Sequence, residues 1–111
     1  MRPIRKTLSS ATSTTPVPMD LYRDPFNVSL AVSLPAGSSL TYTVEYTVDD
    51  VFDNAFDPAT ATWVAVTGMG AQTTGTQGNI AFPVTAIRLR VSAFTSGSAT
   101  LTIIQAGVKG A

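Results

Sequence analysis

Apolar residues occupy every even position of two consecutive runs that are separated by a short turn. The ten residues are Phe26, Val28, Leu30, Val32 and Leu34, followed by Leu40, Tyr42, Val44, Tyr46 and Val48. Side chains alternate between the two faces of a β-strand, so each run predicts a strand with one apolar and one polar face. Residues 35 to 39 contain the proline, glycine and serines that are typical of a chain reversal. The pattern therefore predicts an amphipathic β-hairpin.

More short strands follow in the rest of the chain. Trp63 lies in one, Ile80 and Phe82 alternate in another, and two further runs show the same period of two. These last runs are Ile87, Leu89, Val91 and Ala93, then Ala99, Leu101 and Ile103. Residues 49 to 61 and 67 to 79 are predicted to be long loops. Because no helical periodicity accompanies these strands, a chain of 111 residues predicts one all-β domain, a small antiparallel β-sandwich.

Two segments of this domain resemble each other. Residues 32 to 44 and residues 91 to 103 each join two alternating runs through a bend that contains serine and glycine. This weak repeat indicates that the two ends of the domain are built alike.

The first 19 residues have a different character from the rest. They are rich in serine, threonine and proline, and their scattered apolar residues do not form a face. Pro16 and Pro18 flank Val17 and would stiffen an extended stretch, which lowers the entropy lost on docking. We therefore expect an extended N-terminal arm over residues 1 to 19 and the sandwich domain over residues 20 to 111, with a disordered tail as the alternative.

The charges of the chain cancel. Seven basic and seven acidic residues leave no global field that would attract nucleic acid or anionic lipid, so we expect neither as a partner. Locally the charges separate. Arg2, Arg5 and Lys6 make the N-terminus basic, and five of the acidic residues gather in one stretch, namely Glu45, Asp49, Asp50, Asp53 and Asp57.

The sequence has neither a secretion signal nor a run of membrane-helix length, and we expect a protein made and used without secretion.

Catalysis receives little support from the residues. Without cysteine or histidine, the chain lacks thiol nucleophiles, the commonest general base and the usual zinc ligands. Two of the acidic residues could form a glycosidase pair, and several could form a calcium site, but apolar residues interrupt the spacing of a calcium loop. Acidic turn residues are the favoured interpretation. We therefore expect no enzyme, no cofactor and no metal.

Two further groups of residues have competing interpretations. Trp63 with Tyr42 and Tyr46 could form a platform for a sugar, but the even phase of both tyrosines favours a buried aromatic cluster. Arg88 and Arg90 point outward beside an apolar strand, where they could form an intersubunit salt bridge or protect a sheet edge from aggregation.

Four segments of the chain resemble a known family. They are YTVEYTVDDVF from Tyr42 followed by Asp53, Thr62-Trp63-Val64, PVTAIRLRVS from Pro83 to Ser92, and GSATLTIIQAG from Gly97 to Gly107. Together they resemble the capsid staple, or decoration, proteins of epsilon15-type podoviruses, over residues 26 to 107. The resemblance implies a jelly-roll-like sandwich on the outer capsid surface, without catalytic residues. It also implies homodimers at two-fold positions that clamp neighbouring subunits of the major capsid protein lattice.

The leading hypothesis from the sequence is therefore a virion decoration protein, made in the bacterial host cytoplasm, that stabilises the assembled shell. Exposed strand edges of so small a sandwich also favour pairing between copies. Arg2, Arg5 and Lys6 are the predicted anchors of the arm on an acidic capsid surface, with Val17 and Pro18 as apolar contacts. The alternative is a carbohydrate-binding or adhesion module of a phage particle, with the long loops as its contact surface.

Overall fold

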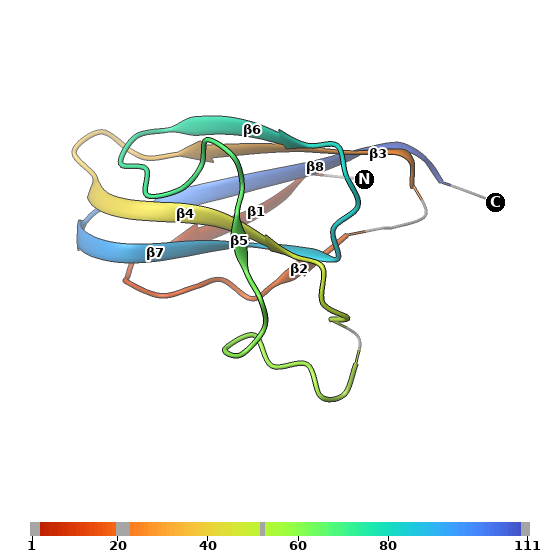
Figure 1. The fold of residues 1–111 in the computed structure, drawn as a ribbon. Coiled ribbons are helices and arrows are strands. Elements are labelled where there is room, and N and C mark those ends of the chain that lie inside the picture. The colour runs from red at the N-terminus through yellow and green to blue at the C-terminus, as the bar shows by residue number, and fades with distance from the viewer. Residues whose placement is uncertain (1–2, 20–22, 52, 110–111) are drawn as a thin grey trace.

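Two four-stranded antiparallel sheets pack face to face in the computed structural model, which describes residues 3–19, 23–51 and 53–109 (Figure 1). Sheet A has the strand order β1-β8-β3-β6 and sheet B the order β2-β7-β4-β5. The strands of sheet A are β1 (Ile4–Leu8), β8 (Ala99–Lys109), β3 (Arg23–Ser33) and β6 (Thr76–Ile80). Those of sheet B are β2 (Val17–Pro18), β7 (Ala86–Ser96), β4 (Ser39–Thr47) and β5 (Val64–Ala65).

This strand order is that of a jelly roll. The first half of the chain pairs antiparallel with the second half, β1 with β8, β2 with β7, β3 with β6 and β4 with β5. The resulting double ribbon is rolled up, and the pairings of β3 with β8 and of β4 with β7 close the two sheets. The predicted fold class, an antiparallel jelly-roll-like sandwich, is confirmed.

The predicted hairpin is wrong, because β3 and β4 lie in different sheets and do not pair. Their connection is a β-turn in which the Ser38 amide donates to the Pro35 carbonyl at 3.1 Å and Gly37 has a φ of 85°. The chain thus crosses from one sheet to the other at this turn. Alternation shows which face of a strand is buried but not which strand lies beside it, and two strands facing each other across a core have the same pattern as a hairpin.

The two similar segments are built alike, although neither is a hairpin and both turns lie at the same end of the sandwich. β7 and β8 also lie in different sheets, so both segments cross the sandwich. Their turns lie against each other, since the Ser98 amide donates to Ser38 Oγ at 3.4 Å. A side chain at Gly97, where φ is 90°, would collide with Ser38.

The predicted core-facing positions are buried along most of their length. Phe26 to Val32 of β3, Leu40 to Val44 of β4, Ile87 to Val91 of β7 and Ala99 to Ile103 of β8 each supply alternate side chains to one core. Burial no longer follows this alternation at the end of β4, where Glu45 and Thr47 are buried at outward positions and Val48 is 65% exposed. Residues beyond Thr47 have left the sandwich, so an inward-facing residue there has no opposite sheet to pack against.

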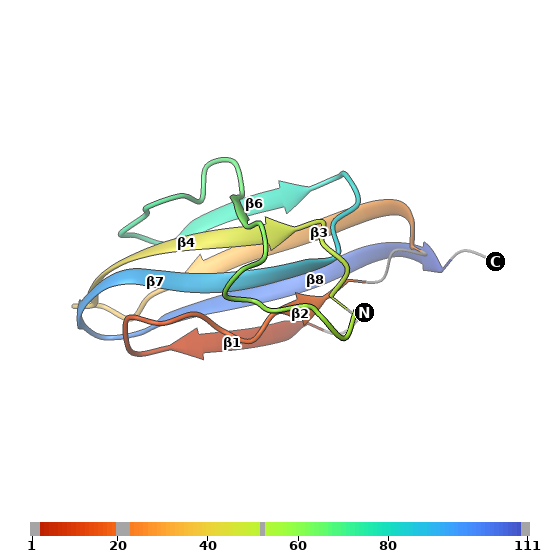
Figure 2. The ribbon, with the colours of Figure 1, turned by 60° about the horizontal axis from the view of Figure 1, so that its bottom comes forward.

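The N-terminal segment belongs to both sheets and is not a separate arm (Figure 2). β1 forms one edge of sheet A on β8, and β2 forms an edge of sheet B on β7. Between them, Thr14 exchanges hydrogen bonds with Leu89 of β7. The segment is extended as predicted, but the expected boundary after residue 19 does not separate it from the sandwich. An edge strand buries only a few side chains, which is why its sequence shows no apolar face.

The predicted loop over residues 67 to 79 contains strand β6. Its sequence, TQGNI, has one large apolar residue and one glycine, so it shows no alternation that would predict a strand. Within the described ranges the structure has no helix that is long and apolar enough to cross a membrane.

Candidate functional site

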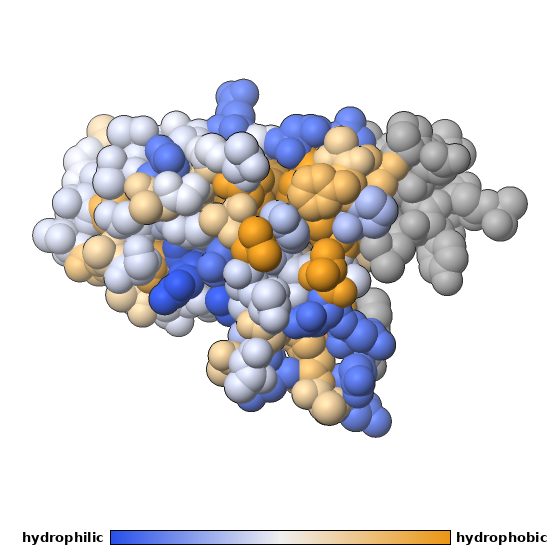
Figure 3. Space-filling model, viewed as in Figure 1, coloured by the Kyte–Doolittle hydropathy of each residue, from blue (hydrophilic) through white to orange (hydrophobic). Residues whose placement is uncertain are grey.

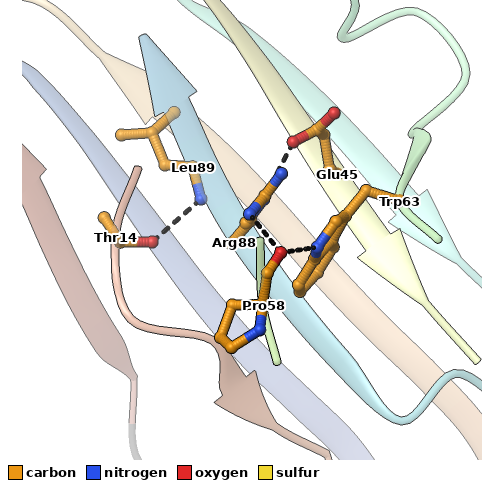
Figure 4. Close-up of polar contacts among 6 residues, drawn as sticks. All are labelled: Thr14, Glu45, Pro58, Trp63, Arg88 and Leu89. Atoms are coloured by element: carbon orange, nitrogen blue, oxygen red, sulfur yellow. Dashed lines mark hydrogen bonds and ion pairs between the residues drawn. The ribbon is translucent and has the colours of Figure 1, made fainter. Parts of the chain in front are cut away.

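The outer face of sheet B carries a buried ion pair between neighbouring strands. Glu45 of β4 and Arg88 of β7 are partners in the register of these strands, so their side chains emerge side by side. The Arg88 Nε donates to Glu45 Oε1 at 2.9 Å, and only 13% and 10% of the two side chains are exposed (Figure 4). Because each charge compensates the other, both side chains tolerate this burial.

Trp63 covers the guanidinium of Arg88. The guanidinium carbon lies 4.1 Å from the centre of the indole ring, a cation–π geometry. The indole Nε1 donates to the Pro58 carbonyl at 2.9 Å, and the same carbonyl accepts a longer bond of 3.4 Å from Arg88 Nη1 (Figure 4). We call Glu45, Pro58, Trp63 and Arg88 the Arg88 cluster. It fastens the connection between β4 and β5 to the sheet.

That connection projects from the sandwich as an acidic loop, residues 49–61 (Figure 1). Asp49 closes its base, since its Oδ2 accepts the Thr62 amide at 2.8 Å. Asp53 and Asp57 are exposed, and the Oδ1 of each accepts the amide two residues later, at 2.9 Å in both cases. These are Asx turns, so the interpretation as acidic turn residues is confirmed for both aspartates.

The acidic residues do not form an evident reaction centre. Asp49, Asp50, Asp53 and Asp57 line a surface depression of the acidic loop, but in the described part of the chain no three acidic side chains are placed to hold one metal ion. Glu45 lies apart from them on the sheet, and its carboxylate is engaged by Arg88. The acidic loop thus presents an exposed, acidic surface.

The three aromatic residues singled out in the sequence lie in different places, so the prediction of one aromatic cluster is wrong. Tyr42 is fully buried, and its hydroxyl lies 2.5 Å from the Thr74 carbonyl and 2.7 Å from Thr76 Oγ1. Burial raises the pKa of this phenol, and the hydrogen bond to Thr76 partly opposes the rise. Tyr46 packs edge-on against Phe82 with ring centres 5.3 Å apart. Trp63 stacks on Arg88, so a three-ring platform for a sugar does not form.

The structure separates the predicted capsid-contact residues. Arg5 of β1 and Pro18 of β2 are exposed, whereas Lys6 is half-buried beside the core. Val17 is 4% exposed and packs in the core of its own domain, so its prediction as an outward contact is wrong. Arg2 lies outside the described residues.

Of the two arginines predicted at a subunit interface, Arg88 is occupied within the chain by Glu45 and Trp63, whereas Arg90 is exposed. The sequence reasoning missed the Arg88 cluster, although Glu45 and Arg88 both stand at outward positions of their strands. Only the pairing of β4 with β7 makes them neighbours.

Comparison with known proteins supports the fold. No protein-family model and no curated protein matches the chain. A solved chain from Bacillus endospore appendages, described as a novel family of disulfide-linked pili, is similar with a TM-score of 0.52 and 12% identity, over 97% of this chain and 87% of that chain. At this identity the likeness shows a shared fold alone.

Proposed function

We propose that this protein is a virion decoration protein that binds the outer surface of a tailed-phage shell and stabilises the assembled lattice. The sequence resemblance to capsid staple proteins supports the proposal. The observation that carries it is the acidic loop, a charged segment that projects from a compact sandwich and is fastened to it by the Arg88 cluster.

A projecting loop is suited to clamping only if it keeps its shape when free. Three contacts hold this one: the stacking of Trp63 on Arg88, the bonds to the Pro58 carbonyl, and the bond between Asp49 and Thr62. Preorganisation lowers the entropy lost on binding, so a fixed loop binds more tightly than a flexible one of the same charge. The loop thus replaces the N-terminal arm as the proposed clamp.

The mechanism is thermodynamic and needs no reaction. A protein that binds the assembled lattice better than free capsid subunits shifts the equilibrium toward the intact shell. The chain has no cysteine, so disulfide bonds cannot attach it, unlike the disulfide-linked pili to which its fold is similar. Many modest contacts repeated over a shell supply the required free energy.

Cosedimentation with purified shells tests the proposal. The native protein should pellet with assembled shells, should not bind free capsid subunits as tightly, and should raise the temperature at which shells fall apart. Failure to bind shells would contradict the function.

A second experiment tests the loop. Asp53→Asn with Asp57→Asn keeps an oxygen for each Asx turn and removes two charges, so it should weaken shell binding several-fold without changing the melting temperature of the free protein. Arg90→Gln, an exposed change on the sheet, is the control. Unchanged binding by the double variant would remove the loop from the proposed contact.

A further inference from the structure

On the side of the sandwich opposite the N-terminal strands, sheet A ends in β6 (Figure 2). The neighbouring edge of sheet B is covered by β5 and by the segment that follows it, because Tyr42 and Gln72 exchange backbone hydrogen bonds and the Val44 amide donates to the Met69 carbonyl. In the described part of the chain no backbone–backbone hydrogen bond reaches β6 from beyond its outer edge. β6 therefore presents the unpaired amides and carbonyls of an edge strand.

β6 lacks the devices that usually protect such an edge. It has no charged residue and no proline, and its five residues pair with β3 without a register shift. The opposite edge of sheet A carries Arg5 and Lys6, and β2 contains Pro18. An uncharged, regular edge strand is a template for another strand.

The surroundings of β6 are uncharged and partly apolar. No Asp, Glu, Lys or Arg occurs from Pro58 to Ile87, the segment that contains β5, β6 and the connections on both sides of β6. Phe82, just beyond β6, is 49% exposed. On the neighbouring edge of sheet B, Val64 of β5 is 44% exposed, and Val48, just beyond β4, is 65% exposed. Figure 3 faces this side, and hydrophobic residues appear there between β6 and the region of β5. Exposed apolar surface of this kind marks an interaction site.

We propose that β6 pairs antiparallel with β6 of a second copy, which joins the two A sheets into one continuous eight-stranded sheet. The sequence of β6 complements itself in this arrangement. A two-fold axis at Gly78 places Gln77 opposite Asn79 of the second copy, on the outer face, and Thr76 opposite Ile80, on the core-facing side. The two amide side chains can donate to and accept from each other, and no like charges meet.

This register also keeps the faces of the two sheets aligned. Residues opposite each other are both odd or both even, so each inward side chain meets an inward side chain. Phe82 then lies beside the connection that precedes β6 of the second copy. The inference concerns pairing between copies and does not depend on binding to a shell.

Sedimentation of the full chain tests the proposal. The native protein should form a dimer, and Gln77→Lys with Asn79→Lys should weaken it about tenfold or more, because two pairs of like charges then face each other across the strands. The effect should shrink at high salt. Thr100→Lys with Thr102→Lys, which adds the same charge two strands away on the same face, should leave the dimer intact.

A charge-swap experiment makes the test specific. The variant Gln77→Glu with Asn79→Glu, studied by itself, should also form a weaker dimer than the native protein. Mixing it with the lysine variant should restore a dimer that contains one copy of each. A native protein that stays monomeric at every attainable concentration would overturn the proposal. A strand of another protein would then be the candidate partner of β6. A dimer that the edge variants do not weaken, or that the control weakens equally, would also overturn it.

Discussion

At the level of single residues, the Arg88 cluster shows how one side chain organises a surface. Arg88 makes an ion pair with Glu45, stacks on Trp63 and bonds to the Pro58 carbonyl, so it joins β4, β7 and the acidic loop. A lysine in its place would lack the planar group that stacks on the indole, and it would have one donor nitrogen where Arg88 uses two, Nε and Nη1.

Arg88→Ala should therefore lower the free energy of unfolding by roughly 3 kcal/mol, since it leaves the buried Glu45 carboxylate without its partner. It should also expose Trp63, which a red shift of the indole fluorescence would report. Arg90→Ala, an exposed change two residues along the same strand, should cost less than about 0.5 kcal/mol. Equal losses in the two variants would contradict the assigned role of Arg88.

Tyr42 gives the fold a dependence on alkaline pH. Because burial raises the pKa of this phenol above its ordinary value of 10.0, the folded protein holds the proton at a pH where the unfolded chain releases it. The contribution of Tyr42 to the free energy of unfolding is therefore fully present below pH 10, the pKa of the phenol in the unfolded chain. It is lost as the pH rises through the higher pKa of the folded state.

Tyr42→Phe should remove this loss, so that its free energy of unfolding falls less steeply above pH 10 than that of the native protein. At neutral pH the variant should be less stable by roughly 1 kcal/mol, because the bonds to Thr74 and Thr76 are gone. Urea unfolding at a series of pH values measures both effects, and parallel pH profiles would refute the explanation.

At the level of elements, the N-terminal strands close one side of the sandwich. β1 covers the outer edge of β8, β2 covers that of β7, and Val17 and Met19 fill the core between them. This differs from the expectation of a separate arm, under which truncation would leave the fold untouched.

Deletion of residues 1–15 should lower the free energy of unfolding by roughly 2–4 kcal/mol, because Ile4 and Leu8 no longer pack and the edges of β7 and β8 lose hydrogen bonds. Deletion of residues 1–3 alone, which spares β1, is the control and should have little effect. Urea denaturation followed by circular dichroism measures the difference. Unchanged stability after the longer deletion would restore the idea of a separate arm.

For the whole molecule, the proposed shell contact and the proposed pairing edge use different parts of the surface. The acidic loop extends from the end of β4, whereas β6 ends sheet A (Figure 1). A pair joined through β6 would carry two acidic loops, and two attachments that reach the shell together bind far more tightly than one.

The β6 edge variant, Gln77→Lys with Asn79→Lys, should therefore bind shells roughly a hundredfold more weakly than the native protein, although its acidic loop is intact. The control Thr100→Lys with Thr102→Lys should bind normally. Equal affinities of the native protein and the edge variant would mean that pairing adds nothing to attachment. That result would leave the dimer itself in place.

The sequence by itself determined the class of fold and most of the core. Alternation is a local property of a strand, so Val28, Leu30, Val44, Leu89 and Leu101 could be assigned to the core without knowing where each strand lies. The aspartates of the acidic loop could likewise be recognised as turn residues, because an Asx turn needs only the next two residues.

Only the tertiary structure decided how the strands pair and which polar residues meet. β3 and β4 have the pattern of a hairpin yet face each other across the core, and short strands such as β1 and β6 form because an existing sheet offers them partners. Glu45 and Arg88 are far apart in the sequence and become an ion pair only when β4 lies beside β7. Several strands with similar local patterns could pair with one another in a sheet. Long-range packing of the complete molecule determines which of them do.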